Sequence, residues 1–294
     1  MFNRVAIIGL GLIGGSLGLA LRQARAARQV AGFDLSKGVG DRARKLGAID
    51  QSCASLAEAA RGSELIILAT PVGTMRSLLQ QLATLASSGA VVTDVASTKA
   101  QVISWAEEFL PATISFVGGH PIAGKETSGI EAADATLFKQ CTYCLTPTKR
   151  TSPAALDKVA ALIDALGAHM RFLEPPEHDG MVAGVSHLPY IASIALMQTA
   201  ALNPAWDDAS LLAGNGFRDM TRLAAGSPEM HRDICLTNSE TITRWLADYI
   251  AILSTLRERI AMRDPNLSEV FAQAQKARNA WQEAQEQAKN SDPK

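Results

Sequence analysis

The amino-acid sequence predicts an α/β fold, a doubly wound parallel sheet followed by an all-helical domain. Three features support this prediction. An apolar strand pattern at the start of the chain leads through a glycine-rich turn into a helical pattern. Short apolar runs then alternate with helical patterns as far as about residue 173. From Asp179 onward nearly every segment has a helical pattern, so we expect two domains, residues 1–174 and residues 175–294, which meet at Glu174-Pro175-Pro176.

The first turn contains the glycine spacing G-x-G-x-x-G directly after the strand predicted at residues 5–8. Gly9 allows a sharp turn, Gly11 lacks a Cβ so that a pyrophosphate can approach the backbone, and Gly14 lets the helix pack close to the sheet. The N-terminus of that helix offers unpaired N–H groups and the positive end of its dipole to phosphates. Strand, turn and helix in this order predict a Rossmann-type dinucleotide-binding domain.

The cofactor that we expect in this domain is NAD. The next strand pattern, residues 29–33, ends in Asp34, about 20 residues beyond the last glycine, where an acid binds the adenine ribose hydroxyls. A carboxylate there repels the additional phosphate of NADP, although Lys37 lies nearby. Four more positions at strand ends are expected to contact the cofactor: Leu12, Ile13, Thr70 and Pro71.

The other elements of the first domain are expected in alternation. Helices are predicted at about residues 40–46, 56–61, 74–86, 99–109 and 153–166, and strands at about residues 48–49, 64–69, 90–94, 114–117, 143–147 and 169–173. The near-continuous apolar run at residues 64–69 is typical of a parallel strand buried on both faces. In the second domain, residues 181–201 and 234–260 are too apolar for solvated helices, so we expect them to pack on each other or on a second copy of the chain.

Composition argues against several classes of function. The 294 residues are 47% hydrophobic and 19% charged, which is typical of a globular enzyme with a substantial core. The net charge is −1 without a basic block, so neither a nucleic-acid nor a membrane partner is expected. Outside the uncharged stretch from Val5 to Leu21, no apolar run is expected to approach a membrane span. That stretch also resembles a signal-peptide core, but its glycine spacing favours the phosphate-binding turn.

The cysteines indicate a reduced, cytoplasmic setting, because the four of them are too few and too scattered for a disulfide framework. Cys141 and Cys144 form a C-x-x-C with no second pair, so no metal site is expected. An offset of three on a strand would place these two side chains on opposite faces, which favours ordinary packing.

The candidate catalytic residues follow the carboxyl ends of predicted strands, where open α/β sheets bind ligands. His120 is expected on a glycine-rich loop after the strand at residues 114–117, near the nicotinamide. A pKa near neutrality suits histidine to accept the proton of an alcohol as hydride leaves. Ser97 is placed to hydrogen-bond the same hydroxyl or, together with Asp94, to cap the helix that follows.

The helical domain supplies further candidates. His187 lies in an apolar helix, where a histidine is either a buried structural residue or a pocket residue. Arg218 and Arg222 follow Gly214-Asn215-Gly216, and guanidinium groups are the usual anchors for a substrate carboxylate. The alternative for both arginines is an ion pair with Asp219 or Asp233. The remaining histidines are interpreted as structural or surface residues: His169, His178 and His231.

Four segments together resemble the prephenate/arogenate dehydrogenases of tyrosine biosynthesis. They are GLGLIGGSLGLAL, GGHPIAG, VSHLPY and GFRDMTRLA, and the similarity extends from about residue 4 to about residue 260. The HPxAG and FRDxTR motifs are more specific than the dinucleotide fingerprint. The resemblance implies an oxidative decarboxylation in which NAD takes hydride from the carbinol carbon of a cyclohexadiene ring and the ring carboxylate leaves as CO2. It also implies a helical second domain that builds a homodimer.

The resemblance also implies a role for individual residues. His120 corresponds to the residue that accepts the proton of the ring hydroxyl, and Ser97 to the serine that orients this hydroxyl and the histidine. Arg222 corresponds to the arginine that binds a substrate carboxylate, and His187 to a histidine of the substrate pocket. Asp219 is expected to gate the pocket or to favour an amino-bearing substrate.

Lys125 stands where some relatives carry a small hydroxyl residue, and we expect it to contact the substrate. Prephenate is the favoured substrate, and arogenate is the alternative. Other dehydrogenases of this architecture, the β-hydroxyacid dehydrogenases, use a lysine of the second domain as acid and base, and the sequence has none between Gly180 and Asp264. A catalytically silent NAD sensor is a further alternative, but it would have no reason to keep histidine, serine and arginine side chains at the nicotinamide end.

Overall fold

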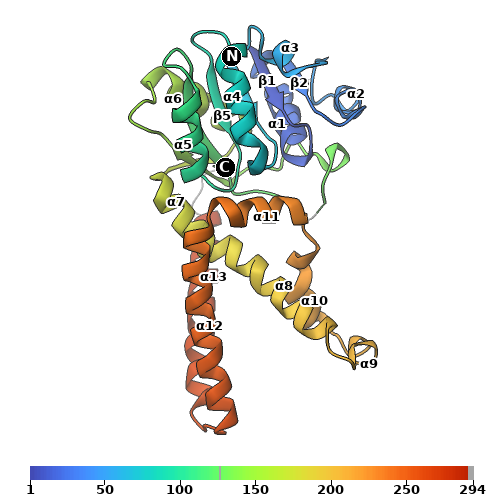
Figure 1. Cartoon of the computed structure of the whole chain (residues 1–294), viewed down its shortest axis with the longest axis vertical. Coiled ribbons are helices and arrows are strands. Elements are labelled where there is room, and N and C mark those ends of the chain that lie inside the picture. Colours follow the sequence, from blue (N-terminus) through green and yellow to red (C-terminus); the bar gives the residue numbers. More distant parts are fainter. Residues whose placement is uncertain (126, 291–294) are drawn as a thin grey trace. The chain divides into compact units, whose positions relative to one another are not determined.

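The computed structural model describes residues 1–125 and 127–290. The chain divides into two compact units, residues 1–242 and residues 243–294, which are treated separately below. An eight-stranded sheet forms the centre of the first unit (Figure 1), with the strand order β3-β2-β1-β4-β5-β6-β7-β8. Its strands are β1 (Phe2–Ile8), β2 (Ala27–Phe33), β3 (Gln51–Ser52), β4 (Leu65–Leu68), β5 (Val91–Asp94), β6 (Ser115–Pro121), β7 (Thr142–Thr146) and β8 (His169–Phe172).

The sheet confirms the doubly wound prediction over most of its width. The six neighbouring strands β3, β2, β1, β4, β5 and β6 pair in parallel. The strand order reverses between β1 and β4, the place where this architecture binds dinucleotides. β7 differs from an all-parallel sheet because it pairs antiparallel with β6, while β8 is again parallel to β7. The short strand predicted at residues 48–49 is displaced to β3, and Ile49 is instead a buried core residue.

Both faces of the sheet are covered, as the apolar runs require. The covering helices are α1 (Leu12–Gln23), α2 (Val39–Lys45), α3 (Leu56–Ala60), α4 (Met75–Leu85), α5 (Ala100–Phe109) and α6 (Pro153–Leu166). Successive residues of β1 point to opposite faces, so Ile7 lies in the core beneath α1 and α6, and Ile8 in the core beneath α3, α4 and α5. Helix α6 has the predicted ends, because the Ser152 hydroxyl accepts from the N–H of Ala155 and Gly167 closes the helix at a φ of +68°.

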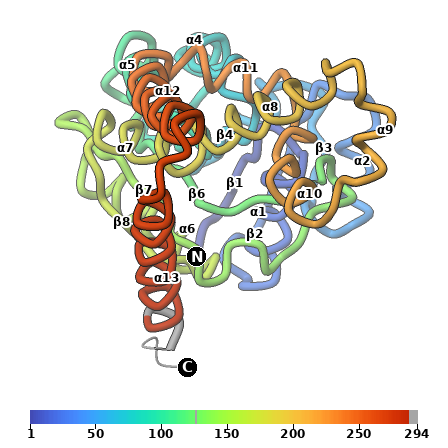
Figure 2. Tube along the Cα trace, turned by 90° about the horizontal axis from the view of Figure 1, so that it is seen from below, coloured from blue at the N-terminus to red at the C-terminus, as the bar shows by residue number. Residues whose placement is uncertain are grey.

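The chain after β8 is helical, and the boundary predicted after residue 174 falls directly before α7. Helix α7 (Pro175–Val182) continues through a π-helical turn (Ala183–His187) into α8 (Leu188–Ala201). Helix α10 (Asn215–Thr221) packs beside α8 (Figure 2). The other helices are α9 (Trp206–Ser210), α11 (Pro228–Thr237), α12 (Ser239–Ala261) and α13 (Leu267–Asn290), with 3-10 turns at Val72–Thr74, Ile130–Ala132 and Arg222–Ala225.

One expectation about apolar runs is wrong. The continuous helical stretch Pro175–Ala201 is 27 residues long, with a mean hydropathy of 1.4 in its most apolar window, so its length and composition would suffice to cross a membrane. A single such helix is weak support for a membrane span, because helices in protein cores and interfaces have the same composition. His178, Asp179 and His187 interrupt the apolar pattern of this stretch in the sequence, although all three are buried in the fold.

The second unit comprises the rest of α12 and helix α13. Both helices expose large apolar side chains, among them Trp245, Ile250, Ile252 and Trp281. The helix predicted over residues 234–260 is divided in the structure, because α11 ends at Thr237 and α12 begins at Ser239.

Candidate active site

The turn after β1 has the geometry that the glycine spacing predicts. Gly9 has a φ of +94°, and a side chain there would collide with the backbone of Ala69. A Cβ on Gly14 would overlap the carbonyl oxygen of Gly9, so this position accepts only glycine. The space in front of Gly11 is open, since no described atom beyond Gly11 and its two chain neighbours lies within 4 Å of the place where its Cβ would be. The N-terminus of α1 is therefore free to receive a bulky anion.

Asp34 follows β2 beside this turn. One carboxylate oxygen accepts from the backbone N–H of Leu10 at 2.8 Å, and the other accepts from the N–H of Ser36 at 2.8 Å. These two bonds fix the carboxylate next to the glycine turn, where a ribose bound with its phosphates at α1 would lie.

A cavity of about 740 Å³ opens beside the glycine turn, at the carboxyl end of the sheet. Its walls come from the turns after β1, β4 and β5, the end of β6 with the segment after it, and the helical segments around α8 and α11. The predicted site residues that line this cavity are Gly11, Leu12, Ile13, Thr70, Pro71, Ser97, His120, Lys125 and Arg222. Residues far apart in the sequence therefore meet at one site.

His120 lines the cavity from within a strand and not from a loop, contrary to the prediction. The strand β6 continues to Pro121 because β7 pairs with it antiparallel, with His120 opposite Cys144. The glycines before His120 serve close packing, since a Cβ on Gly119 would lie 2.7 Å from the carbonyl oxygen of Asp94 and 2.9 Å from the ring of Tyr143. A strand gives the imidazole a more rigid support than a loop would.

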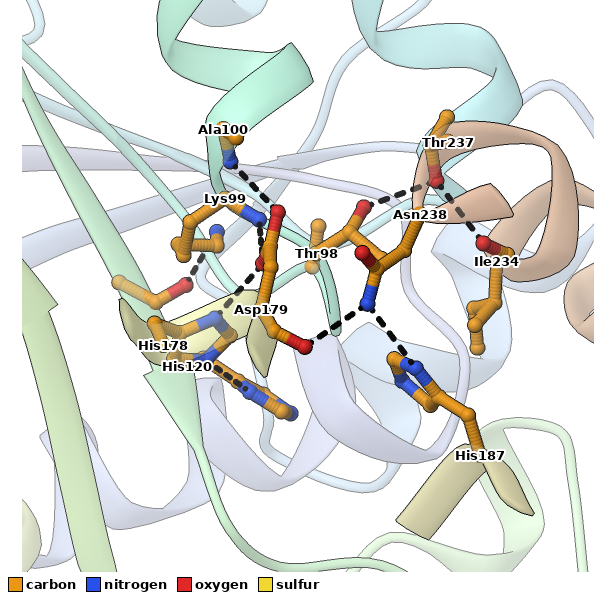
Figure 3. A network of polar contacts seen from close by, with 12 residues as sticks. Thr98, Lys99, Ala100, His120, His178, Asp179, His187, Ile234, Thr237 and Asn238 are labelled. Carbon is orange, nitrogen blue, oxygen red and sulfur yellow. Dashed lines mark hydrogen bonds and ion pairs between the residues drawn. The ribbon is translucent and has the colours of Figure 1, made fainter. Parts of the chain in front are cut away.

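A chain of hydrogen bonds extends from His120 into the interior (Figure 3). Nδ1 of His120 lies 2.9 Å from Nε2 of His178, and Nδ1 of His178 lies 2.9 Å from a carboxylate oxygen of Asp179. Burial, followed by repulsion from His178, Lys99 and His187, holds the pKa of His120 well below its usual value of 6.5. His120 is therefore neutral at physiological pH and able to accept a proton.

The helix cap predicted from Asp94 and Ser97 is supplied by another residue. Asp179, from α7, accepts from the backbone N–H groups of Lys99 at 2.7 Å and Ala100 at 2.9 Å, and so caps α5 from outside the helix. Ser97 is therefore not needed as a cap and faces the cavity from the segment between β5 and α5.

Asp94 forms a fully buried ion pair with Lys99, whose Nζ also donates to the carbonyl oxygen of Gly119 at 2.7 Å. The Asp94 carboxylate accepts in addition from the N–H groups of Ala96 at 3.0 Å and Gly119 at 3.1 Å. Burial lowers the pKa of Lys99, and the nearby carboxylate of Asp94 opposes this effect. Through these hydrogen bonds to Ala96 and Gly119, the ion pair connects the segment that contains Ser97 with the strand that contains His120.

His187 lies in the π-helical turn and is buried, and it is not among the residues that line the cavity, although its neighbour Ser186 is. Its Nδ1 is 3.4 Å from the side-chain nitrogen of Asn238, which also donates to the carbonyl oxygen of Asp179 at 2.9 Å. Burial lowers the pKa of His187 to about 4. Within the described residues its Nε2 has no hydrogen-bond partner. The structure thus places this histidine behind the wall of the expected substrate pocket.

Of the charged residues predicted to bind the substrate, two line the cavity and one lies at the surface. Arg222 lines the cavity from the turn after α10, and Lys125 lines it while pairing with Asp134 at 2.9 Å. Asp219 is exposed, lies 3.9 Å from Arg218 and does not line the cavity, so its placement does not suit the expected gate. The sequence placed it near Arg222 because they are three residues apart, but α10 ends between them.

Two lining residues were not recognised from the sequence. The rings of Tyr190 and His231 stack with centroids 3.3 Å apart and planes 2° from parallel, and both face the cavity. The sequence also predicts a structural or surface position for His178. In the structure this side chain is buried and contacts His120. No local sequence pattern indicates this contact of His178, since its partner lies 58 residues away. Within the described part of the chain, no group of three or more His, Cys, Asp or Glu side chains could hold a metal ion.

Two family models match successive parts of the chain. The family model described as prephenate dehydrogenase, nucleotide-binding domain, matches residues 17–172, and that described as prephenate dehydrogenase, dimerization domain, matches residues 174–273. The prephenate dehydrogenase of Bacillus subtilis is 35% identical over 95% of this chain and 76% of its own length. The cyclohexadienyl dehydrogenase of Zymomonas mobilis is 33% identical over 95% of this chain and 96% of its own length.

Solved structures resemble the whole chain as well. Prephenate dehydrogenase from A. aeolicus, in complex with hydroxyphenyl propionate and NAD+, superimposes with a TM-score of 0.88 at 31% identity, covering 95% of this chain and 98% of that one. Synechocystis arogenate dehydrogenase gives a TM-score of 0.79 at 32% identity, covering 95% of this chain and 99% of that one.

Proposed function

The chain belongs to the prephenate dehydrogenase family, and on this premise we propose that it catalyses the NAD-dependent oxidative decarboxylation of prephenate to 4-hydroxyphenylpyruvate. The observation that carries the proposal is that a dinucleotide-binding turn, a neutral imidazole and a guanidinium line one cavity. Gly11 belongs to the turn, His120 supplies the imidazole and Arg222 the guanidinium. Such a cavity unites the binding of a hydride acceptor with a base and a carboxylate anchor.

NAD is the cofactor, and the site fits it. The open space before Gly11 and the unpaired N–H groups at the start of α1 suit a pyrophosphate, and Asp34 stands beside them to accept from ribose hydroxyls. We assign the walls of the nucleotide site to Leu12, Ile13, Thr70 and Pro71. When bound, NAD accepts the hydride from the carbinol carbon of the substrate.

His120 acts as the base. The hydroxyl proton of the substrate passes to its Nε2 as the C–H bond breaks and the hydroxyl becomes a carbonyl, while Ser97 orients the hydroxyl by a hydrogen bond. The ring carboxylate then leaves as CO2, its bonding electrons make the ring aromatic, and the proton returns from His120 to the ring oxygen. Charge is conserved, because a dianion and NAD+ become a monoanion, CO2 and NADH.

The charges of the cavity favour prephenate over arogenate. Prephenate carries two carboxylates. Two cations line the described cavity, Arg222 and Lys125, and no described Asp or Glu lines it, although Asp134 pairs with Lys125 from outside the lining. Arogenate has an ammonium group in addition, which such a wall does not stabilise. A relative named cyclohexadienyl dehydrogenase and a solved arogenate dehydrogenase make arogenate the second candidate.

We further propose a homodimer in the cytoplasm, with a division between the nucleotide domain (1–174) and the helical domain (175–294). The dimerization-domain model covers residues 174–273, and apolar side chains on and near α8 are exposed in the single chain, among them Leu196 at 37% and Leu202 at 82%. The four cysteines are free thiols, which suits a reducing compartment. Light scattering tests the dimer: it should give about twice the 31.2 kDa of one chain, and a monomer would contradict it.

The test of the function combines purified protein with prephenate or arogenate and with NAD or NADP, and follows nicotinamide reduction by absorbance. We expect rapid reduction with prephenate and NAD, and slower reduction in the other combinations. Faster turnover of arogenate would transfer the assignment to the second candidate. Absence of reduction in all four mixtures would contradict dehydrogenase activity.

A further inference from the structure

The hydrogen bonds from Asp179 through His178 to His120 determine which ring nitrogen of each histidine carries the proton. The Asp179 carboxylate accepts from two backbone N–H groups, those of Lys99 and Ala100, and these bonds hold it in place whichever way the neighbouring rings are protonated. The oxygen that accepts from Lys99 also meets Nδ1 of His178 at 2.9 Å. A carboxylate oxygen accepts, so the proton of a neutral His178 must be on Nδ1.

The next bond follows from the first. With its proton on Nδ1, His178 presents the lone pair of Nε2 to His120, and the distance to Nδ1 of His120 is 2.9 Å. Nδ1 of a neutral His120 must then carry the proton, which leaves its Nε2 without one. Nε2 is the ring nitrogen that remains for the cavity lined by His120.

We propose that His178 and Asp179 are positioning residues that fix His120 as its Nδ1–H tautomer, so that Nε2 is held ready to accept a proton from the substrate. The catalytic consequence rests on the proposed function, whereas the tautomer itself does not. When Nε2 takes the proton, the resulting imidazolium donates from Nδ1 to His178, and Asp179 stabilises the additional charge through the same chain.

Asp179 has a second effect on the same site. Its carboxylate caps α5, and the segment just before that helix carries Ser97 into the cavity. Its own backbone carbonyl accepts from Asn238, which also contacts His187 (Figure 3). One residue of α7 therefore orients the base through His178 and holds in place the segment that presents the serine.

The matched variants are His178→Gln and His178→Leu. Glutamine offers an amide oxygen that accepts from Nδ1–H of His120, whereas leucine has a similar size and no acceptor. We expect His178→Leu to lower kcat by about 10²- to 10⁴-fold, the range observed when a catalytic histidine loses its base function or its tautomer. We expect His178→Gln to stay within about tenfold of the parent. We expect the NAD affinity of both variants to be unchanged, since the hydrogen bonds of His178 go to His120 and Asp179.

The tautomer is read directly from nitrogen chemical shifts in ¹⁵N-histidine-labelled protein, which contains only five histidines. The His120 signals are assigned by their loss in His120→Asn. We expect a protonated Nδ1 and an unprotonated Nε2 in the parent protein and in His178→Gln, and a mixture of tautomers in His178→Leu.

A protonated Nε2 in the parent protein would overturn the proposal, and so would equal losses of kcat in the two variants with an unchanged tautomer. If His178→Leu does not fold, the measurement on the parent protein and the glutamine variant still decides. A protein that shows the expected tautomer but no reaction with prephenate would contradict the proposed function and leave the inference about His120 standing.

Discussion

The buried pair of Lys99 and Asp94 permits a quantitative prediction for Lys99→Met. Both side chains are fully buried, and the ammonium contacts the Asp94 carboxylate and the carbonyl oxygen of Gly119. Methionine keeps most of the volume of the stem but leaves Asp94 charged, with only the N–H groups of Ala96 and Gly119 as donors. Breaking a buried ion pair by removing one partner costs about 3–5 kcal/mol, because the other charge stays buried without compensation.

Urea unfolding at neutral pH, followed by circular dichroism, measures this cost. A matched control is Lys158→Met, because Lys158 lies 3.8 Å from Glu64 in a pair that is about one third exposed, and such pairs contribute about 0–1 kcal/mol. The double variant Lys99→Met/Asp94→Asn removes the uncompensated charge, and we expect its loss to shrink to about 1–2 kcal/mol. Equal losses for Lys99→Met and Lys158→Met, or a double variant as unstable as Lys99→Met alone, would refute the reasoning.

Three predictions concern the reaction. His120→Asn removes the base, and we expect kcat to fall by about 10²- to 10⁴-fold while the NAD dissociation constant, measured by titration, stays the same; turnover near that of the parent would exclude His120 as the base. Arg222→Gln leaves a substrate carboxylate without its partner. We expect the KM for prephenate to rise by roughly 30-fold or more, which corresponds to a loss of about 2 kcal/mol or more of binding free energy. An unchanged KM in steady-state assays would exclude Arg222 from the site. The pKa of His120 lies well below 6.5, and the neutral imidazole is the active form. The value of kcat/KM should therefore be constant above pH 6.5 and fall only as the pH drops through the lowered pKa. A fall in kcat/KM with its midpoint at or above pH 6.5 would contradict the burial of this histidine.

The parts of the fold that follow from local pattern could be predicted from the sequence. The glycine turn has the expected form because Gly9 and Gly14 leave no room for a side chain, while the space in front of Gly11 stays open. Helix α6 begins and ends where Ser152 and Gly167 indicate, since a cap depends on residues within one turn. The apolar run of β4 is buried on both faces as expected for a central parallel strand.

The parts that depend on pairing between distant segments could not be predicted. The antiparallel partner β7 turns the expected His120 loop into strand, and nothing near His120 in the sequence indicates this pairing. The cap of α5 comes from Asp179, 79 residues beyond Ala100, so Ser97 and Asp94 looked like the better candidates. His178 contacts His120 across 58 residues, and a histidine at the start of an apolar helix has no sequence pattern that distinguishes this position from a structural one.

The central claim is that His120 presents Nε2 to the reacting hydroxyl while the nicotinamide lies over the same ring. A crystal structure with NAD and the product 4-hydroxyphenylpyruvate tests it most directly. We expect the phenolic oxygen at about 2.6–3.2 Å from Nε2 of His120. The nicotinamide C4 should face the ring carbon that bears this oxygen, and a carboxylate of the product should bind Arg222. A product ring bound away from His120, or facing it with the nicotinamide on the far side of the cavity, would contradict the claim.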